Sequence, residues 1–289
     1  MRQELKGTGV ALATPMNKDY GVDFPALEKL INHTIDGGVD YLVVLGTTGE
    51  SPVFSWEEKL EILDFVFKVN ADRKPIVFGL GGNHTFDLIE KSKDLKKFEL
   101  SAILSASPYY NKPSQEGIVR HYEMLADAFP FPIILYNVPA RTASNIIADT
   151  TLTLAKHPNI IAIKEASWDL DQCKKIAHEK PSDFLLISGD DALTYKLIKE
   201  GAEGVISVIS NLLPAPFINM VSAALQNSFE EAERIEEDLK KAYELLSQEG
   251  NPTSLKAGLE VKGICRRTVK PPLYNASENL IAAWEHYLK

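Results

Sequence analysis

Ile160-Ile161-Ala162-Ile163-Lys164 is a run of apolar, mostly β-branched residues that ends in a charged one. A short apolar run without polar alternation is typical of a strand whose two faces are both covered by other elements. The residues after it have the spacing of a helix, which is the order of elements in a parallel strand–helix unit. The run therefore predicts a buried parallel strand with Lys164 at its carboxyl end.

The same pattern recurs on both sides of this run. Apolar runs followed by longer helical segments occur at residues 9–13, 41–45, 76–80, 102–104, 133–136, 160–164, 184–187 and 204–208. Eight such units in about 210 residues favour a closed (β/α)8 TIM barrel over an open sheet. We expect residues 1–215 to form this barrel.

Beyond the eighth run the alternation of strands and helices stops. From Pro216 onward the pattern is helical, and one amphipathic helix is expected before Gly250-Asn251-Pro252. Its apolar face is formed by Phe229, Ala232, Ile235, Leu239, Ala242, Tyr243 and Leu246. We expect residues 216–289 to form a helical region packed on the barrel, in preference to a groove for a partner protein.

Composition and charge exclude several classes of protein. The 289 residues carry a net charge of −9, which repels the phosphates of nucleic acids and of anionic lipids, so we expect neither partner. Residues 1–6 lack the apolar stretch of a signal peptide, and no run of about 18 apolar residues suggests a membrane span. Cys173 and Cys265 form neither a disulfide framework nor a zinc motif. These features predict a cytoplasmic location.

Polar residues that end apolar runs are the first candidates for a site, because barrels of this class bind substrates at the carboxyl ends of their strands. Apolar walls around Lys164 disfavour its ammonium form, and a neutral lysine can attack a ketone to form a Schiff base. Tyr136 ends another run and can move a proton during that reaction. Gly46-Thr47-Thr48-Gly49 offers hydroxyls and free N–H groups to a small carboxylate. Taken singly, these are also features of a solvent-exposed lysine, a core tyrosine and a plain turn; together they favour a site.

Five motifs, in this order and spacing, carry a resemblance to a known family. They are GTTGES at 46–51, SPYYN at 107–111, YNVPARTASN at 136–145, IKEAS at 163–167 and ISGDD at 187–191. The chain resembles the dihydrodipicolinate synthase family over essentially its whole length. This resemblance implies a Schiff base of pyruvate on Lys164, with Tyr136 as proton shuttle and with Thr47 and Thr48 binding pyruvate and relaying protons.

The resemblance also implies roles for residues around these four. Tyr110 is similar to a relay residue that reaches into the site of a neighbouring subunit, so a homodimer, pairing further into a homotetramer, is expected. Arg141 lies where the family holds the carboxylate of L-aspartate 4-semialdehyde, a role that suits a guanidinium group. Ile206 matches a family position whose backbone contacts pyruvate. Gly189 is similar to a family residue near the barrel mouth.

The implied reaction is the condensation of pyruvate with L-aspartate 4-semialdehyde to 4-hydroxy-tetrahydrodipicolinate, on the route to diaminopimelate and lysine. N-acetylneuraminate lyases and 2-keto-3-deoxy sugar acid aldolases share the lysine and the tyrosine, and Arg141 is the residue that argues against them. A non-catalytic barrel that binds a keto acid is a third alternative, but such a protein would be free to lose Lys164, Tyr136 or the threonine pair.

Many members of the family are inhibited by lysine at a dimer-interface site. Ser51, Asn83 and Tyr109 match that site, whereas other residues replace the common bacterial His, His and Glu; these are Trp56, Lys59 and Asp87. A cation at Lys59 would repel the ammonium of the ligand, so we expect weak or absent inhibition by lysine.

No cofactor or metal is expected. The glycine-rich segment 79–83 lacks the GxGxxG spacing of a dinucleotide site. The histidines have no HxH or HxxxH spacing, and a protonated imine itself acts as the electron sink.

Overall fold

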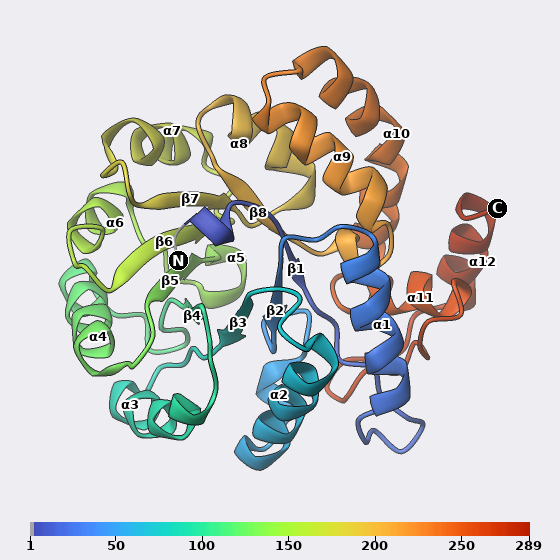
Figure 1. Ribbon diagram of the computed structural model, residues 1–289, viewed down its shortest axis with the longest axis horizontal. Coiled ribbons are helices and arrows are strands. Elements are labelled where there is room, and N and C mark those ends of the chain that lie inside the picture. The colour runs from blue at the N-terminus through green and yellow to red at the C-terminus, as the bar shows by residue number, and fades with distance from the viewer. Residues whose placement is uncertain (1–2) are drawn as a thin grey trace.

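The computed structural model describes residues 3–289 and shows a closed barrel of parallel strands (Figure 1). Within those residues the barrel has eight strands, each hydrogen-bonded to the next along the chain, with β8 closing on β1. The strands are β1 (Gly7–Ala11), β2 (Tyr41–Val44), β3 (Ile76–Gly79), β4 (Ala102–Ala106), β5 (Ile133–Asn137), β6 (Ile160–Glu165), β7 (Leu185–Ser188) and β8 (Gly204–Ser207). The predicted (β/α)8 barrel is confirmed.

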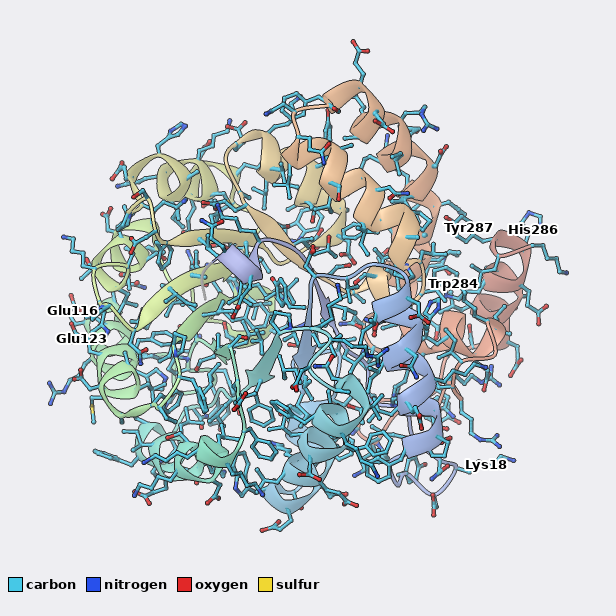
Figure 2. All side chains as sticks on the ribbon, viewed as in Figure 1. Lys18, Glu116, Glu123, Trp284, His286 and Tyr287 are labelled. Atoms are coloured by element: carbon cyan, nitrogen blue, oxygen red, sulfur yellow. The ribbon has the colours of Figure 1, made fainter. Side chains whose placement is uncertain are left out.

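Helices surround the barrel. Those between the strands are α1 (Phe24–Asp36), α2 (Trp56–Asn70), α3 (Thr85–Asp94), α4 (Gln115–Ala128), α5 (Pro139–Thr142), α6 (Ala148–Leu154), α7 (Leu170–Glu179) and α8 (Thr194–Lys199). Short 3-10 turns are η1 (Gln3–Leu5), η2 (Ser51–Val53), η3 (Leu95–Lys97), η4 (Asp191–Leu193) and η5 (Ile209–Asn211). Figure 2 shows that charged side chains such as Glu116 and Glu123 of α4 point away from the barrel, as the polar face of an amphipathic helix should.

Two apolar layers result from the alternation of side chains along the strands. One layer fills the barrel interior; it is formed by Leu5, Ala11, Tyr41, Val43, Val77, Ala102, Leu104, Ile134, Tyr136, Val138, Ile161, Ala162, Leu185, Ile187 and Ile206. The larger layer lies between the strands and the helices. Leu5 belongs to the interior and lies two residues before β1, so it closes the amino end of the barrel. Polar side chains enter the interior from the opposite end.

The first strand begins two residues earlier than the predicted segment 9–13. Gly7 and Thr8 pair with the first two residues of β8, so pairing across the closure of the barrel extends the strand backward. A Cβ on Gly9 would lie 2.1 Å from the Tyr41 ring, so glycine is required there for the ring to fill the interior. This closure involves residues far apart in the sequence, which is why the local pattern did not reveal it.

Side-chain caps define where several of the surrounding helices begin. At the start of α2 the Ser55 hydroxyl accepts a hydrogen bond from the Glu58 N–H at 3.1 Å, and the Glu58 carboxylate accepts one from the Ser55 N–H at 2.7 Å. Asp169 caps α7 by accepting from the Gln172 N–H at 2.9 Å. Such caps satisfy N–H groups that the first turn of a helix leaves unpaired. At α2 and α7 they therefore fix where the loop after the preceding strand ends and the helix begins.

The C-terminal helices are α9 (Pro214–Leu225), α10 (Phe229–Gln248), α11 (Thr253–Val261) and α12 (Glu278–Tyr287). The predicted amphipathic helix is α10, which packs along α9. Trp284 of α12, labelled in Figure 2, is fully buried and donates its indole N–H to the Ser254 carbonyl at 3.0 Å. This contact ties α12 to α11. In the described part of the chain, no helix combines the length and apolar character that a membrane span needs.

Candidate active site

Lys164 and Tyr136 lie side by side because their strands pair in register. They are Cα partners on β6 and β5, and both side chains point into the barrel interior. The Lys164 Nζ lies 4.3 Å from the centre of the Tyr136 ring. Both residues are buried, with 5% and 7% of their surfaces exposed. The arrangement places an amine against a phenol at the end of an apolar cavity wall, which suits Schiff-base chemistry assisted by proton transfer.

Asp190 brings a carboxylate into the electrostatic range of Lys164. Burial raises the pKa of Asp190, while the hydrogen bonds from the Leu193 and Ala192 N–H groups and the positive charge of Lys164 oppose that rise. Its Oδ1 accepts those two hydrogen bonds at 3.2 and 3.0 Å. Asp190 belongs to the ISGDD motif, from which no role was predicted for it; its position two residues after β7 was the available signal.

The threonine pair lies in a tight turn at the carboxyl end of β2. The Gly49 N–H donates to the Gly46 carbonyl and the Glu50 N–H to the Thr47 carbonyl, both at 3.1 Å. Thr48 is buried, and its Oγ1 accepts a hydrogen bond of 2.9 Å from the Asn251 side-chain amide. The Thr47 side chain is half-buried. The turn therefore presents one hydroxyl that is already held by the C-terminal region and one that is partly accessible.

Ile206 lies on β8, and Gly189 directly follows the neighbouring strand β7. Ile206 is buried within the barrel interior. Gly189 donates its N–H to the Glu165 carbonyl at 2.8 Å, and a Cβ there would lie 2.7 Å from the Ala166 Cβ. Glycine is thus required for the chain after β7 to approach the chain after Lys164. Both predicted residues therefore lie at the end of the barrel that contains Lys164.

Arg141 and Tyr110 are exposed at the rim. Arg141 lies on α5, directly after β5, and donates from Nη2 to the Asn251 carbonyl at 3.2 Å. Tyr110 is 88% exposed and has a φ of 72°, a conformation that is uncommon for a residue with a side chain. Such strained positions cluster at functional sites.

A buried polar network centred on Glu165 supports the site from behind. Its carboxylate accepts hydrogen bonds from the Asn137 amide at 3.0 Å, the Gln172 amide at 3.0 Å and the Ser167 N–H at 2.7 Å. Burial raises the pKa of Glu165, and these hydrogen bonds oppose the rise. Asn137 and Glu165 directly follow Tyr136 and Lys164. No role was predicted for either residue, because nothing in the local pattern indicates that they meet.

Burial keeps three other potentially reactive groups neutral, namely two thiols and one imidazole. Burial raises the pKa of both Cys173 and Cys265 to about 12, and it lowers the pKa of His121 to about 4. The thiols are therefore poor nucleophiles. Across residues 3–289, no group of three or more His, Cys, Asp or Glu side chains is arranged to hold a metal ion.

The residues of the expected lysine site form two groups. In the first, the Trp56 indole N–H donates to Asp94 at 2.8 Å, and Asp87 forms an ion pair of 2.6 Å with Lys91. Lys59 interacts electrostatically with the same ion pair. Burial lowers the pKa of Lys59, the charge of Lys91 lowers it further, and the charge of Asp87 raises it. In the second group, the side-chain amide of Asn83 donates to the Tyr109 carbonyl at 3.1 Å. Ser51 begins η2 and is half-buried.

Comparison with known proteins gives a consistent result. The model of the Dihydrodipicolinate synthetase family matches residues 4–289. The chain belongs to this family. It is 47% identical over 281 residues to the 4-hydroxy-tetrahydrodipicolinate synthase of Flavobacterium psychrophilum, covering 96% of the chain and 95% of that relative. It is 48% identical over 280 residues to the same-named protein of Porphyromonas gingivalis, covering 96% and 94%.

A solved structure of the family has the same fold. The dihydrodipicolinate synthase from Acinetobacter baumannii, described as chloride inhibited and complexed with pyruvate, has a TM-score of 0.95 to this chain. The two are 35% identical, and the match covers 98% of each chain. The resemblance deduced from the five motifs is therefore confirmed at the level of the family.

Proposed function

We propose that this chain condenses pyruvate with L-aspartate 4-semialdehyde to give 4-hydroxy-tetrahydrodipicolinate, a step in diaminopimelate and lysine biosynthesis. The observation that carries the proposal is the pairing of Lys164 with Tyr136 at the barrel mouth, with a Nζ-to-ring distance of 4.3 Å. Membership of the dihydrodipicolinate synthetase family and relatives named for this activity support it.

In the proposed mechanism the Lys164 amine attacks the ketone carbon of pyruvate. Tyr136 gives a proton to the resulting carbinolamine oxygen, and loss of water leaves an imine. Removal of a proton from the methyl group gives an enamine, whose carbon attacks the aldehyde. The amine of the semialdehyde then attacks the imine carbon, closes the ring and displaces Lys164. One water is released overall, and the lysine returns to its starting state.

The residues around Lys164 hold the two substrates. We assign the pyruvate carboxylate to Thr47 and Thr48, with backbone contacts from Ile206 and Gly189. The end of the barrel at which these residues lie supports this assignment. The pyruvate named for the Acinetobacter baumannii relative is consistent with it.

Arg141 determines which aldehyde the site accepts. Its exposed guanidinium, on the turn directly after Tyr136, suits the carboxylate of the semialdehyde. The sugar acid lyases usually lack this arginine. We therefore favour the synthase reaction over N-acetylneuraminate cleavage.

We further propose that Tyr110 acts in the site of a neighbouring subunit. Its 88% exposure leaves the phenol free to reach another chain. The active form would then be a homodimer, pairing into a homotetramer, in the cytoplasm. Sedimentation equilibrium tests the state of assembly, and a monomer with full activity contradicts this part of the proposal.

Inhibition by lysine is proposed to be weak or absent. The ion pair of Asp87 with Lys91 and the nearby charge of Lys59 support this, because a cationic ligand would meet a carboxylate that is already neutralised. A relative from Cyanidioschyzon merolae is described with lysine bound, so lysine binding by this chain has to be measured directly. Strong inhibition of turnover by submillimolar lysine contradicts the proposal.

The experiment that tests the function measures consumption of pyruvate with L-aspartate 4-semialdehyde, beside cleavage of N-acetylneuraminate. Rapid turnover with the semialdehyde alone supports the synthase. Cleavage of the sugar acid alone moves the chain to the lyase branch. Borohydride trapping with pyruvate should label the wild type and leave Lys164→Ala unlabelled; undiminished labelling of that variant rejects Lys164 as the nucleophile.

A further inference from the structure

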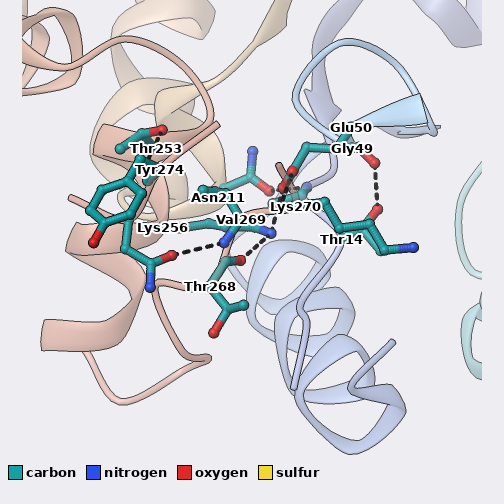
Figure 3. Close-up of polar contacts among 12 residues, drawn as sticks. Thr14, Gly49, Glu50, Asn211, Thr253, Lys256, Thr268, Val269, Lys270 and Tyr274 are labelled. Carbon is teal, nitrogen blue, oxygen red and sulfur yellow. Dashed lines mark hydrogen bonds and ion pairs between the residues drawn. The ribbon is translucent and has the colours of Figure 1, made fainter. Parts of the chain in front are cut away.

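A buried ion pair connects the turn after β2 with the C-terminal helical region. The Lys256 Nζ of α11 lies 2.6 Å from Glu50 Oε1, and the two side chains are 0% and 2% exposed (Figure 3). Lys256 also donates to the Thr268 carbonyl at 2.8 Å, and Glu50 Oε2 accepts from the Lys270 N–H at 3.0 Å. The charges of Glu50 and Lys256 therefore pair with each other across the contact between the turn and the C-terminal region.

Stability alone is a weak explanation for such a pair. The cost of removing two charges from water is roughly what their attraction returns, so an apolar pair of equal volume is often as stable. Burial lowers the pKa of Lys256, while the charge of Glu50 opposes that change. The pair does fix the position of Glu50, because it holds the Glu50 carboxylate against α11 in one geometry.

Glu50 lies within the turn that holds the threonine pair. It has a φ of 54°, and its N–H donates to the Thr47 carbonyl at 3.1 Å. The Gly49 carbonyl just before it accepts from the Thr14 hydroxyl at 2.9 Å, also drawn in Figure 3. A shift of Glu50 would therefore move the peptide groups that carry Thr47 and Thr48.

Asn251 makes a second connection from the C-terminal region to the same turn. Its side-chain amide donates to Thr48 Oγ1 at 2.9 Å, and its carbonyl accepts from Arg141 Nη2 at 3.2 Å. One residue thus links the threonine assigned to pyruvate with the arginine assigned to the aldehyde. Through these two contacts, the chain after β8 forms one side of the barrel mouth.

We propose that the C-terminal helical region positions Thr47 and Thr48, acting through the Glu50–Lys256 ion pair and through Asn251. Glu50, Lys256 and Asn251 are positioning residues, since they act through the turn and not on the reacting atoms. The inference rests on the proposed function, which assigns the threonine pair to pyruvate. The C-terminal region then supports the substrate site through the turn, without contacting the reacting atoms.

Two variants and one control separate positioning from folding. Asn251→Ala removes the contact to Thr48 at a half-buried position. The double variant Glu50→Gln with Lys256→Met replaces the ion pair by neutral side chains of similar length, so no lone buried charge remains. Thr253→Val is the matched control: its hydroxyl bonds to the Tyr274 carbonyl at 3.4 Å, within the C-terminal region and away from the turn (Figure 3).

The measurements are KM for each substrate, kcat, the rate of imine trapping with pyruvate, and the melting temperature. Both variants should raise KM for pyruvate about tenfold and slow trapping, with melting temperatures within a few degrees of the wild type. Thr253→Val should leave KM and trapping unchanged. Wild-type KM and trapping in both variants overturn the inference, as does an equal rise of KM in the control.

Failure of the proposed function has a different signature. A wild-type chain that neither traps pyruvate on Lys164 nor consumes the semialdehyde refutes the function itself. A wild type that does both, beside variants that match it in KM and trapping, refutes only the positioning role. If the double variant does not fold, Asn251→Ala by itself decides the outcome, since a KM equal to that of the wild type overturns the inference.

Discussion

Replacement of Glu165 by alanine tests whether the buried network behind Lys164 serves the reaction. The change leaves the Ser167 N–H without the carboxylate that accepts from it at 2.7 Å, at a cost of about 1–3 kcal/mol. The Asn137 and Gln172 amides keep acceptors at Asn145 and Ile146, so each loses only about 0.5–1 kcal/mol.

The remaining contributions oppose one another. A small cavity replaces the side chain, while the cost of burying an ionised carboxylate without a cationic partner disappears. We expect a net loss of about 3 kcal/mol in the free energy of unfolding, which for a chain of this size lowers the melting temperature by about 6 °C. Since Ser167 and Asn137 hold the segments next to Lys164 and Tyr136, imine formation should slow about tenfold.

The assay combines thermal unfolding with the rate of borohydride trapping in the presence of pyruvate. Glu203→Ala is the matched control, because Glu203 accepts from the Leu186 N–H at 2.9 Å and pairs with Lys180 at the amino end of the barrel. The control should lose stability and keep its trapping rate. A Glu165→Ala variant that traps pyruvate as fast as the wild type would refute the reasoning, whatever its melting temperature.

Three further predictions concern the rim, the assembly and pH. Arg141→Ala should raise KM for the semialdehyde about 10- to 100-fold with less effect on pyruvate, because a charge-assisted contact is worth about 1.5–3 kcal/mol; equal effects on both substrates contradict its role. Mixing Tyr110→Phe with Tyr136→Phe should restore activity in mixed dimers, each of which regains one intact site, whereas no recovery indicates that Tyr110 acts within its own chain. Burial raises the pKa of Asp191 from 3.8 to about 6, so its contribution to stability is complete below pH 4 and is lost as the pH rises to about 6. The free energy of unfolding falls by about 3 kcal/mol over this range. Asp191→Asn should abolish this pH dependence of the melting temperature, and a variant with the wild-type pH profile would contradict the prediction.

Much of the barrel and the centre of the site follow from local patterns. Apolar runs of three to five residues between helical segments predicted the eight strands, and their polar ends predicted where side chains enter the mouth. Lys164 and Tyr136 were predictable for this reason. The backbone alternates with a period of two, so the inward face of each strand follows once its core residues are known.

The supporting contacts were not predictable, because they join distant parts of the chain. Lys256 meets Glu50 across 206 residues and Asn251 meets Thr48 across 203, and neither segment carries a local sign of its partner. The pairing of β1 with β8 at Gly7 is of the same kind.

By itself, the sequence determined the order of strands and helices, the family, and the residue types available for Schiff-base chemistry. The tertiary structure alone decided which of those residues meet. Periodicity specifies the direction of a side chain relative to its own strand, whereas register and packing between strands specify its neighbours. Tyr136 and Lys164 became partners only when β5 paired with β6, and the threonine turn was held only when α11 packed against it.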